Sequence, residues 1–315
     1  MSKPVFISEY TRNPANVLTV GTFDGVHLGH QALIGNVVRR ARRKKAPAVV
    51  ITFDPHPREV INPASDGIRL LTTLGERAAI MQDYGIDQMV VIPFNRDFSI
   101  LTSEEFIREY VFNRIGVDEF VIGYDHHFGR DRQGSIDTLN MLSEELGFSI
   151  HVEKAHEVGH VTVSSTVIRR LLEVEGDVVA ASEMLGRSYE ISGTIVKGDQ
   201  RGRTIGFPTA NLEPDSNRKV LPAVGVYCVE TMLEGQCYRG MMNIGYRPTF
   251  SGEKKLVPEV HLFDFNRMIY GSRMRVRFVR RIRGEQKFNS VEALVEQLVR
   301  DRQECLRFAN STEKT

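Results

Sequence analysis

The sequence has few cysteines, no tryptophan and no long apolar run. Its 315 residues include three widely spaced cysteines, Cys228, Cys237 and Cys305, and no Cys-x-x-Cys pair, so neither a disulfide framework nor a cysteine zinc site is indicated. No apolar stretch approaches the roughly 20 residues that span a bilayer. The N-terminal residues lack the apolar core of a secretory signal. We therefore expect reduced thiols, a cytoplasmic location and no membrane partner.

Net charge is also nearly absent. The chain has 41 Lys and Arg against 40 Asp and Glu, a balance that gives no reason to expect a nucleic-acid partner. The basic run 39–45 falls at the end of a predicted helix, where cations complement the helix dipole, and we interpret it as a solvated helix end. A hydrophobic content of 41% is typical of a globular protein. A monomer or a weak homo-oligomer is expected.

The pattern of predicted helices and strands changes near residue 185. Up to that point apolar runs alternate with helical patterns, which indicates βαβ units around a parallel sheet. Strands are predicted at 17–20, 48–53, 88–93, 119–123 and 149–153, and helices near 30–43, 75–84, 103–114, 136–146, 164–174 and 177–185. Beyond it, strands are predicted at 190–196, 225–231, 238–244, 259–264 and 273–282, followed by one helix at about 290–307. We predict a Rossmann-like α/β domain over 1–185 and a small antiparallel barrel with a C-terminal helix over 186–310.

Residues 21–30 follow a buried strand directly and open a helix. The carboxyl ends of parallel strands are where α/β sheets bind ligands, and the N–H groups at a helix start attract phosphate. Gly21 and Gly29 allow the backbone to approach a ligand closely. His27 and His30, three apart, can both face a phosphate and donate to its oxygens. The segment therefore predicts charge stabilisation at a nucleotide α-phosphate.

A second candidate phosphate-binding element lies at residues 164–169. Its hydroxyl-rich helix start carries Arg169 one turn in, although simple helix capping with a solvated arginine remains open. A zinc site also remains open as an alternative role for the paired histidines. Further zinc ligands could come from His56, His126, His127, His151, His156 and His160.

The stretch 193–211 has the composition of a third phosphate-binding element. Its glycines make a flexible loop, and basic side chains lie close by in sequence. These residues are Gly193, Gly198, Gly202 and Gly206, with Lys197, Arg201 and Arg203. Thr209 and Asn211 are two apart, so in an extended segment their neutral oxygen donors point the same way. That pair suits a Mg²⁺ ion bound to ATP phosphates.

The first two elements together resemble the nucleotidyltransferase superfamily. Gly21–His30, together with Thr52–Pro57, is similar to the N-terminal half of prokaryotic FAD synthetases. The resemblance implies that His27 and His30 contact the ATP phosphates and stabilise the transition state. It also implies a set of ATP-binding residues: Gly21, Phe23, Gly29, Ser164, Ser165, Thr166 and Arg169.

One loop departs from that family pattern. Residues 123–129 match its glycine-to-phenylalanine-glycine frame, but Asp125-His126-His127 replaces a centre that contains arginine or lysine in relatives. Asp125 is kept as a candidate ligand of magnesium or nucleotide. His56 lies between two prolines, and we interpret it as a residue that shapes the loop.

The third element resembles the riboflavin kinase module. Its hallmark is Gly206-Phe-Pro-Thr-Ala-Asn211, and the segment 259–264 fits the same family. Removing a proton from a neutral alcohol needs a base, and a carboxylate is the natural one. The resemblance implies Glu259 as that base, Thr209 and Asn211 as magnesium–nucleotide ligands, and Gly193 and Lys197 as ATP contacts. It also implies that the C-terminal helix walls a flavin pocket.

Together the resemblances imply a bifunctional enzyme of flavin-cofactor synthesis. Riboflavin and ATP would give FMN and ADP, and FMN and ATP would give FAD and pyrophosphate. Mg²⁺ would serve both steps, with no bound redox cofactor, because the flavin is the substrate. Three alternatives stay open: a kinase whose first half is inactive, a nucleotidyltransferase with another acceptor, and a flavin-binding sensor without turnover.

Overall fold

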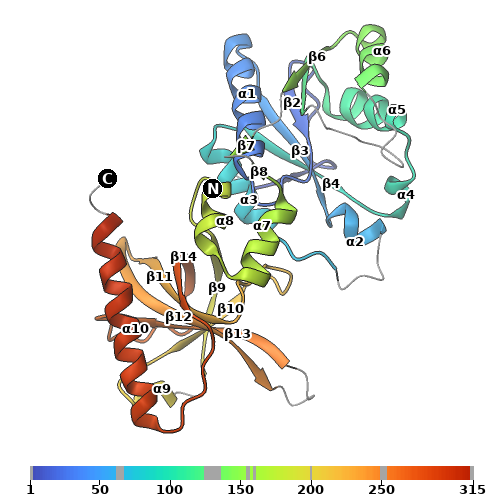
Figure 1. The fold of residues 1–315 in the computed structure, drawn as a ribbon. Helices are drawn as coiled ribbons and strands as arrows, with labels where there is room; N and C mark the ends of the chain where they lie inside the picture. Colours follow the sequence, from blue (N-terminus) through green and yellow to red (C-terminus); the bar gives the residue numbers. More distant parts are fainter. Residues whose placement is uncertain are drawn as a thin grey trace. The chain divides into compact units, whose positions relative to one another are not determined.

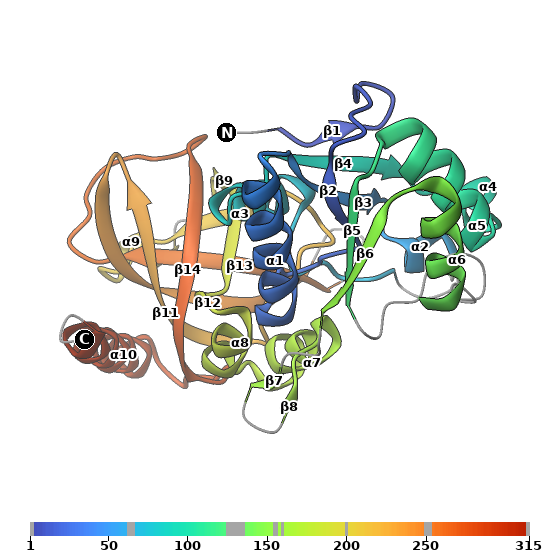
Figure 2. The same ribbon diagram turned by 90° about the horizontal axis from the view of Figure 1, so that it is seen from above.

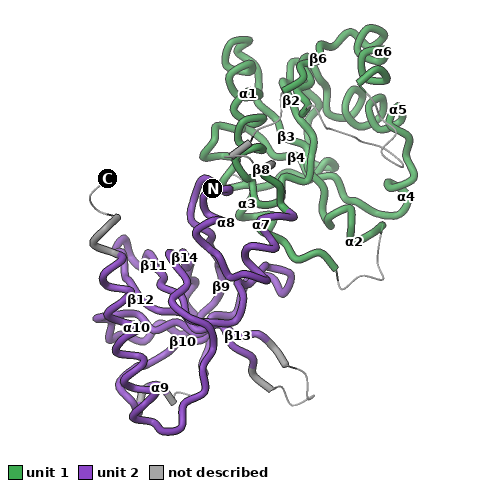
Figure 3. The backbone as a smooth tube through the Cα atoms, in the orientation of Figure 1, with its two compact units in different colours: residues 1–165 green, residues 166–315 purple. Residues whose placement is uncertain are grey.

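The computed structural model describes residues 3–61, 67–123, 136–153, 157–158, 161–198, 201–248 and 254–312. The chain forms two compact units, residues 1–165 and 166–315 (Figure 3). The first is an α/β unit with a parallel sheet and the second contains a closed antiparallel barrel, so the predicted fold class is confirmed (Figure 1). No helix in the described ranges is long and apolar enough to cross a membrane.

Residues 166–185 pack with the barrel. The N–H of Ala223 donates to the carbonyl of Leu172 at 2.8 Å, and Arg281 donates to the carbonyl of Glu175 at 2.8 Å. The boundary between the compact units, after residue 165, therefore comes before the change in sequence pattern near residue 185. The domain ranges 1–185 and 186–310 stay a prediction.

The sheet of the first unit is wholly parallel. Its order is β1 (Val5–Phe6), β4 (Gln88–Pro93), β3 (Ala48–Asp54), β2 (Val17–Val20), β5 (Glu119–Gly123), β6 (Ser149–Glu153). The chain moves outward from β2 through β3 to β4 and then returns to add β5 on the other side. The strand order therefore reverses next to β2, which is where such sheets bind ligands.

Helices cover both faces of this sheet (Figure 2). Ile34 and Val37 of α1 (Leu28–Lys44) pack with Val17 and Val50, as does α3 (Leu74–Asp83) on the same face. The alternate strand residues face η1 (Phe106–Ile115) and α6 (Ile136–Leu146). Strands buried on both faces account for the near-continuous apolar runs in the sequence.

The remaining elements of the first unit are short. They are α2 (Pro57–Ile61), α4 (Arg96–Ser99), α5 (Ser103–Glu105), β7 (Glu157–Val158) and β8 (Val161–Thr162).

The second unit begins with three short helices and continues into the barrel. The helices are α7 (Ser165–Arg170, whose first residue closes the first unit), η3 (Leu171–Glu175) and α8 (Val178–Leu185). The closed barrel has the order β10 (Ala210–Pro214), β13 (Lys254–Leu262), β12 (Gln236–Pro248), β11 (Gly225–Leu233), β14 (Arg273–Arg283), β9 (Glu190–Val196). Leu212, Tyr227, Met242, Val260 and Phe278 are among its buried residues, each at most 2% exposed.

The barrel differs from the expected set of strands in one important way. Its strand β10 lies in a segment with no apolar alternation long enough to predict a strand. Pairing with β9 on one side and β13 on the other closes the barrel and leaves no open edge there. β13 also begins at Lys254 and ends at Leu262, whereas the sequence predicted 259–264.

The C-terminal helix α10 (Val291–Thr312) packs against β12 and β14, while the short α9 (Arg201–Thr204) lies between β9 and β10 in sequence (Figure 1). Cys305 and Leu298 of α10 join an apolar cluster with Cys228 and Met241 of the barrel. The buried Asp301 also accepts from Arg283 of β14 at 2.8 Å. The helix is therefore held by apolar packing and by a buried ion pair.

Substitution of Gly193 tests how closely β9 packs against β10 in the barrel. A Cβ at this position of β9 would overlap the carbonyl oxygen of Glu213 on β10. We expect Gly193→Ala to lower the free energy of unfolding by about 1–3 kcal/mol, because the clash involves backbone that cannot turn aside. Gly284→Ala is the control, since the nearest atom to its Cβ would lie 3.9 Å away. Denaturant unfolding should separate the two variants, and equal midpoints would contradict this close packing.

Candidate functional site

The loop of residues 21–27 leaves β2 at the reversal point of the sheet. It starts in the sheet, since the N–H of Gly21 still donates to the carbonyl of Ile51 at 3.0 Å. It then turns sharply through positive φ at Phe23 (49°), Gly25 (84°) and Val26 (41°). Positive φ is unusual for a non-glycine residue and more so for a β-branched one, so surrounding contacts must hold this backbone.

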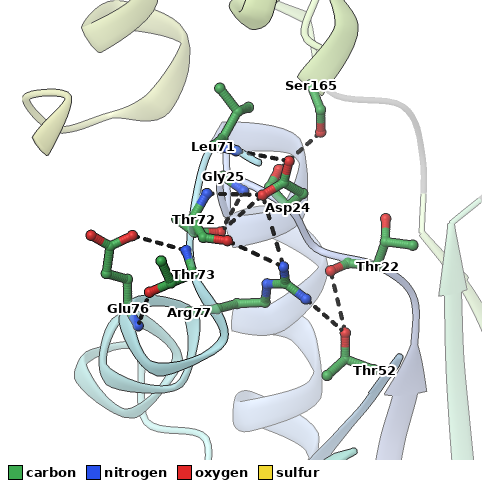
Figure 4. A network of polar contacts seen from close by, with 10 residues as sticks. All are labelled: Thr22, Asp24, Gly25, Thr52, Leu71, Thr72, Thr73, Glu76, Arg77 and Ser165. Carbon is green, nitrogen blue, oxygen red and sulfur yellow. Dashed lines mark hydrogen bonds and ion pairs between the residues drawn. The ribbon is translucent and has the colours of Figure 1, made fainter. Parts of the chain in front are cut away.

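The carboxylate of Asp24 supplies those contacts (Figure 4). It is 1% exposed and accepts from the N–H groups of Leu71 and Thr72 at 3.0 and 2.9 Å. The Thr72 hydroxyl donates to the same carboxylate at 3.1 Å and accepts from the N–H of Gly25 at 3.0 Å. These bonds tie the loop to the segment that leads into α3.

Arg77 neutralises the buried carboxylate from the first turn of α3 (Figure 4). Its guanidinium lies 3.8 Å from Asp24, and the two side chains are 4% and 1% exposed. The same guanidinium donates to the Thr52 hydroxyl at 3.2 Å. The Thr52 hydroxyl in turn donates to the carbonyl oxygen of Thr22 at 3.3 Å. Thr22, through Thr52, and Asp24 are therefore both joined to one buried cation.

Ser165 brings the second predicted phosphate-binding element to this loop. Its hydroxyl donates to the carbonyl oxygen of Asp24 at 2.9 Å (Figure 4). Ser164 precedes this contact in the chain, and Thr166 and Arg169 follow it along α7. Residues 21–27 and 165 are thus in contact although 141 residues separate Asp24 from Ser165.

His27 and His30 lie together at the start of α1. His27 is the N-cap, and its Nδ1 accepts from the N–H of His30 at 3.4 Å. The two rings are stacked with centroids 3.6 Å apart, and the Phe23 ring meets His30 edge-on at 5.1 Å. Because Nδ1 of His27 accepts, its neutral ring carries the proton on Nε2, the atom that can donate to an anion. The first turn of the helix also contains Gly29 and no acidic residue, so it favours phosphate.

The second constellation lies on neighbouring strands of the barrel. Asn211 of β10 is the register partner of Glu259 on β13, and Asn243 of β12 is the partner of Glu259 on its other side. Directly opposite residues place their side chains on one face, with Cβ atoms about 4.5–5.5 Å apart. The residues next to them in sequence, Val260 and Leu212, are buried in the core. The amide, the carboxylate and the second amide therefore form one row on the outer face of the barrel.

A glycine-rich segment lies directly against this row. A Cβ on Gly198 would come within 2.6 Å of the Asn211 amide nitrogen. A Cβ on Gly202 would overlap the carbonyl oxygen of Phe207 and lie 3.4 Å from the Thr209 hydroxyl. Only glycine lets the backbone approach these donors so closely.

His261 holds the turn that precedes Asn211. Its Nδ1 lies 2.8 Å from the carbonyl oxygen of Pro208, and its ring packs against Phe207 with centroids 5.2 Å apart. Burial lowers the pKa of the His261 imidazole below its ordinary value, because a charged ring is poorly solvated there. The ring is therefore neutral at pH 7.

The structure brings most of the expected site residues into these two groups. Lys197 is exposed just after β9, whereas Gly193 is buried within that strand. Asp125 lies outside the described residues, and so do His126, His127, His156 and His160. Within the described ranges no group of three or more His, Cys, Asp or Glu side chains could hold a metal ion.

Sequence reasoning missed the residues that support both groups. Asp24, Thr72 and Arg77 received no role, although an aspartate inside a glycine-containing loop is a signal for buried hydrogen bonding. Asn243 and His261 were also given no role, because their partners are set by strand register and by the fold.

Comparison with known proteins links both groups of residues to described families. A family model for FAD synthetase matches residues 9–167, and one for riboflavin kinase matches residues 185–309. The bifunctional riboflavin kinase/FMN adenylyltransferase of Bacillus subtilis is 38% identical over 302 residues, 95% of this chain and 94% of the relative. That of Escherichia coli K12 is 37% identical over 286 residues, 90% of each chain. A crystal structure from Streptococcus pneumoniae, described as a macrolide-efflux protein, has a TM-score of 0.84 at 34% identity, covering 94% of this chain and 95% of its own.

The buried pair of Asp24 and Arg77 tests the support of the loop. We expect Asp24→Ala to lower the free energy of unfolding by about 3–5 kcal/mol, because it leaves a guanidinium buried without its carboxylate. The double variant Asp24→Ala with Arg77→Met should recover part of that loss, since no buried charge is then left over. Denaturant unfolding of the single and double variants measures the coupling, and simple additivity would contradict it.

Proposed function

The chain belongs to the bifunctional riboflavin kinase/FMN adenylyltransferase family, and on that premise we propose which residues perform each of its two reactions. It phosphorylates riboflavin with ATP to give FMN and ADP, and it adenylylates FMN with ATP to give FAD and pyrophosphate. We assign adenylylation to residues 1–185 and phosphorylation to residues 186–310. The matched ranges 9–167 and 185–309 support this division.

In the adenylylation, an oxygen of the FMN phosphate attacks the α-phosphorus of ATP. The bond from that phosphorus to the bridging oxygen breaks, and pyrophosphate leaves. The attacking group is already an anion, so the rate depends on positioning and on charge stabilisation rather than on a base. His27 and His30 donate to the α-phosphate oxygens, and their stacking 3.6 Å apart supports one shared target.

The remaining polyphosphate contacts are proposed to come from the loop itself and from residues 164–169. Ser164, Ser165, Thr166 and Arg169 hold the β- and γ-phosphates that leave as pyrophosphate, while Gly21, Phe23 and Gly29 contact ATP. The contact between the Ser165 hydroxyl and the carbonyl of Asp24 supports this grouping, because it draws the start of α7 to the loop. The buried Asp24 network keeps the loop in one conformation before ATP arrives.

In the phosphorylation, Glu259 takes the proton of the ribityl hydroxyl of riboflavin. The hydroxyl oxygen forms a bond to the γ-phosphorus of ATP, and the bond between that phosphorus and the bridging oxygen breaks to release ADP. The register pairing of Asn211 with Glu259 is the observation that carries this assignment. It sets the base beside a residue suited to bind the metal–nucleotide, as an in-line transfer requires.

The residues present also fit a magnesium ion at the kinase site. Thr209 and Asn211 offer neutral oxygen donors, and the glycine backbone at 198 and 202 lies directly against these two residues. Mg²⁺ takes few protein ligands and keeps several waters, so two oxygens and the ATP phosphates suffice. When bound, the ion would neutralise polyphosphate charge. Lys197 and Gly193 are proposed ATP contacts of the same site.

We propose a cytoplasmic enzyme whose partners are riboflavin, FMN, FAD and ATP. Consumption of ATP in both reactions supports that location. Neither reaction calls for a nucleic acid, a membrane or a resident redox cofactor. Because both proposed sites draw all their residues from one chain, a monomer or weak homo-oligomer is sufficient.

Paired variants separate the two sites. We expect His30→Ala to slow FAD formation from FMN by about 10²–10³-fold, the loss typical of removing one donor to a developing charge, and to spare FMN formation. Glu259→Ala should slow FMN formation by about 10²–10⁴-fold and spare FAD formation from added FMN. Chromatography of products from riboflavin, FMN and ATP over time measures both. Loss of both activities in a folded variant would argue against separate sites.

The metal requirement tests the ligand pair. We expect Asn211→Ala to raise the Mg²⁺ concentration needed for half-maximal FMN formation by about tenfold or more, because one oxygen donor is lost. Asn243→Ala is the matched control, since Asn243 is an asparagine on the same face, beside Glu259, that is not a proposed ligand. Equal Mg²⁺ dependence of the two variants would rule out Asn211 as a ligand.

A further inference from the structure

His261 connects the strand of the proposed base to the turn of the proposed metal ligands. It lies on β13 two residues after Glu259 and is 8% exposed. Its ring contacts Phe207 and Phe263, with centroids 5.2 and 5.8 Å away. These contacts leave the imidazole little freedom to rotate, so the direction of its Nδ1 atom is fixed.

The Nδ1 atom lies 2.8 Å from the carbonyl oxygen of Pro208. A carbonyl can only accept, so Nδ1 of His261 must carry the proton and donate. The peptide plane that this oxygen belongs to also contains the nitrogen of Thr209. The hydrogen bond therefore orients the backbone on which Thr209 and Asn211 are carried.

The strand register explains why a side chain is needed here. β10 pairs with β13 through Asn211 with Glu259 and Ala210 with Val260, and the pairing stops there. The next residues in that register would be Thr209 and His261. Backbone pairing has ended at this point, and the His261 side chain holds the turn in its place.

We propose that His261 is a positioning residue for phosphoryl transfer, which fixes the Pro208–Thr209 peptide and so the spacing of Thr209 and Asn211 from Glu259. The proposal rests on the roles proposed above for Thr209, Asn211 and Glu259. A histidine that served only to pack Phe207 and Phe263 would affect barrel stability and leave the ATP and Mg²⁺ dependence of the kinase unchanged.

A pair of amide substitutions tests the hydrogen bond without removing polarity. The side-chain nitrogen of asparagine can take the place of Nδ1, whereas that of glutamine corresponds to Nε2. In the full chain we expect His261→Gln to lower kcat/KM for MgATP in FMN formation by about 10–100-fold, the range seen when support of a metal ligand is lost. His261→Asn should stay within about threefold of the wild type, because it retains the donor.

Thr231→Val supplies the matched control. The Thr231 hydroxyl donates to the carbonyl of Arg275 at 2.8 Å, a bond of the same kind in the same barrel between β11 and β14. This variant should lower the unfolding midpoint and leave the ATP and Mg²⁺ dependence of FMN formation at the wild-type values. FAD formation from added FMN should be unchanged in all three variants, because adenylylation is assigned to residues 1–185.

Two results would overturn the proposal. One is equal impairment of His261→Asn and His261→Gln, which would show that packing and not the Nδ1 donor matters. The other is a His261→Gln enzyme with wild-type ATP and Mg²⁺ dependence. Failure of the underlying kinase assignment is distinguishable, because FMN formation would then survive Glu259→Ala or be absent from the wild type.

Discussion

The buried carboxylate of Asp24 is the constraint from which the first site is built. The loop after β2 bends through positive φ at Phe23 and Val26, an unfavourable backbone for both residues. Hydrogen bonds from Leu71 and Thr72 and the charge of Arg77 compensate for it. Without them the start of α1 would be free to change direction, and the two stacked histidines would lose their common target.

In the second unit, strand pairing holds the proposed site residues in position. β10 is short and has β9 and β13 as neighbours, and this pairing sets Asn211 beside Glu259. Where the pairing stops, the bond between His261 and the Pro208 carbonyl continues to hold the chain. In both units, a buried polar side chain from one segment fixes the backbone of another that carries proposed site residues.

The two reactions explain why such different side chains appear in one enzyme. The FMN phosphate is already an anion, so the proposed adenylylation site offers donors and no base. The ribityl hydroxyl of riboflavin is neutral, so the proposed kinase site offers a carboxylate. Each set of side chains suits one nucleophile and is poorly suited to the other. Two sites built on two different folds meet both needs.

The sequence by itself determined the local parts of this protein. Helical patterns and near-continuous apolar runs such as those of β3 and β4 identified most elements, and compact motifs such as Gly206–Asn211 identified the chemistry. Only the tertiary structure decided which segments meet. Asp24 and Leu71 are 47 residues apart, and β10 is a strand only because β9 and β13 flank it. Such contacts depend on register, and a slip of one residue would turn Asn211 to the opposite face from Glu259. Local patterns specify a conformation but not a partner, which is why Asp24, Arg77 and His261 emerged only from the fold.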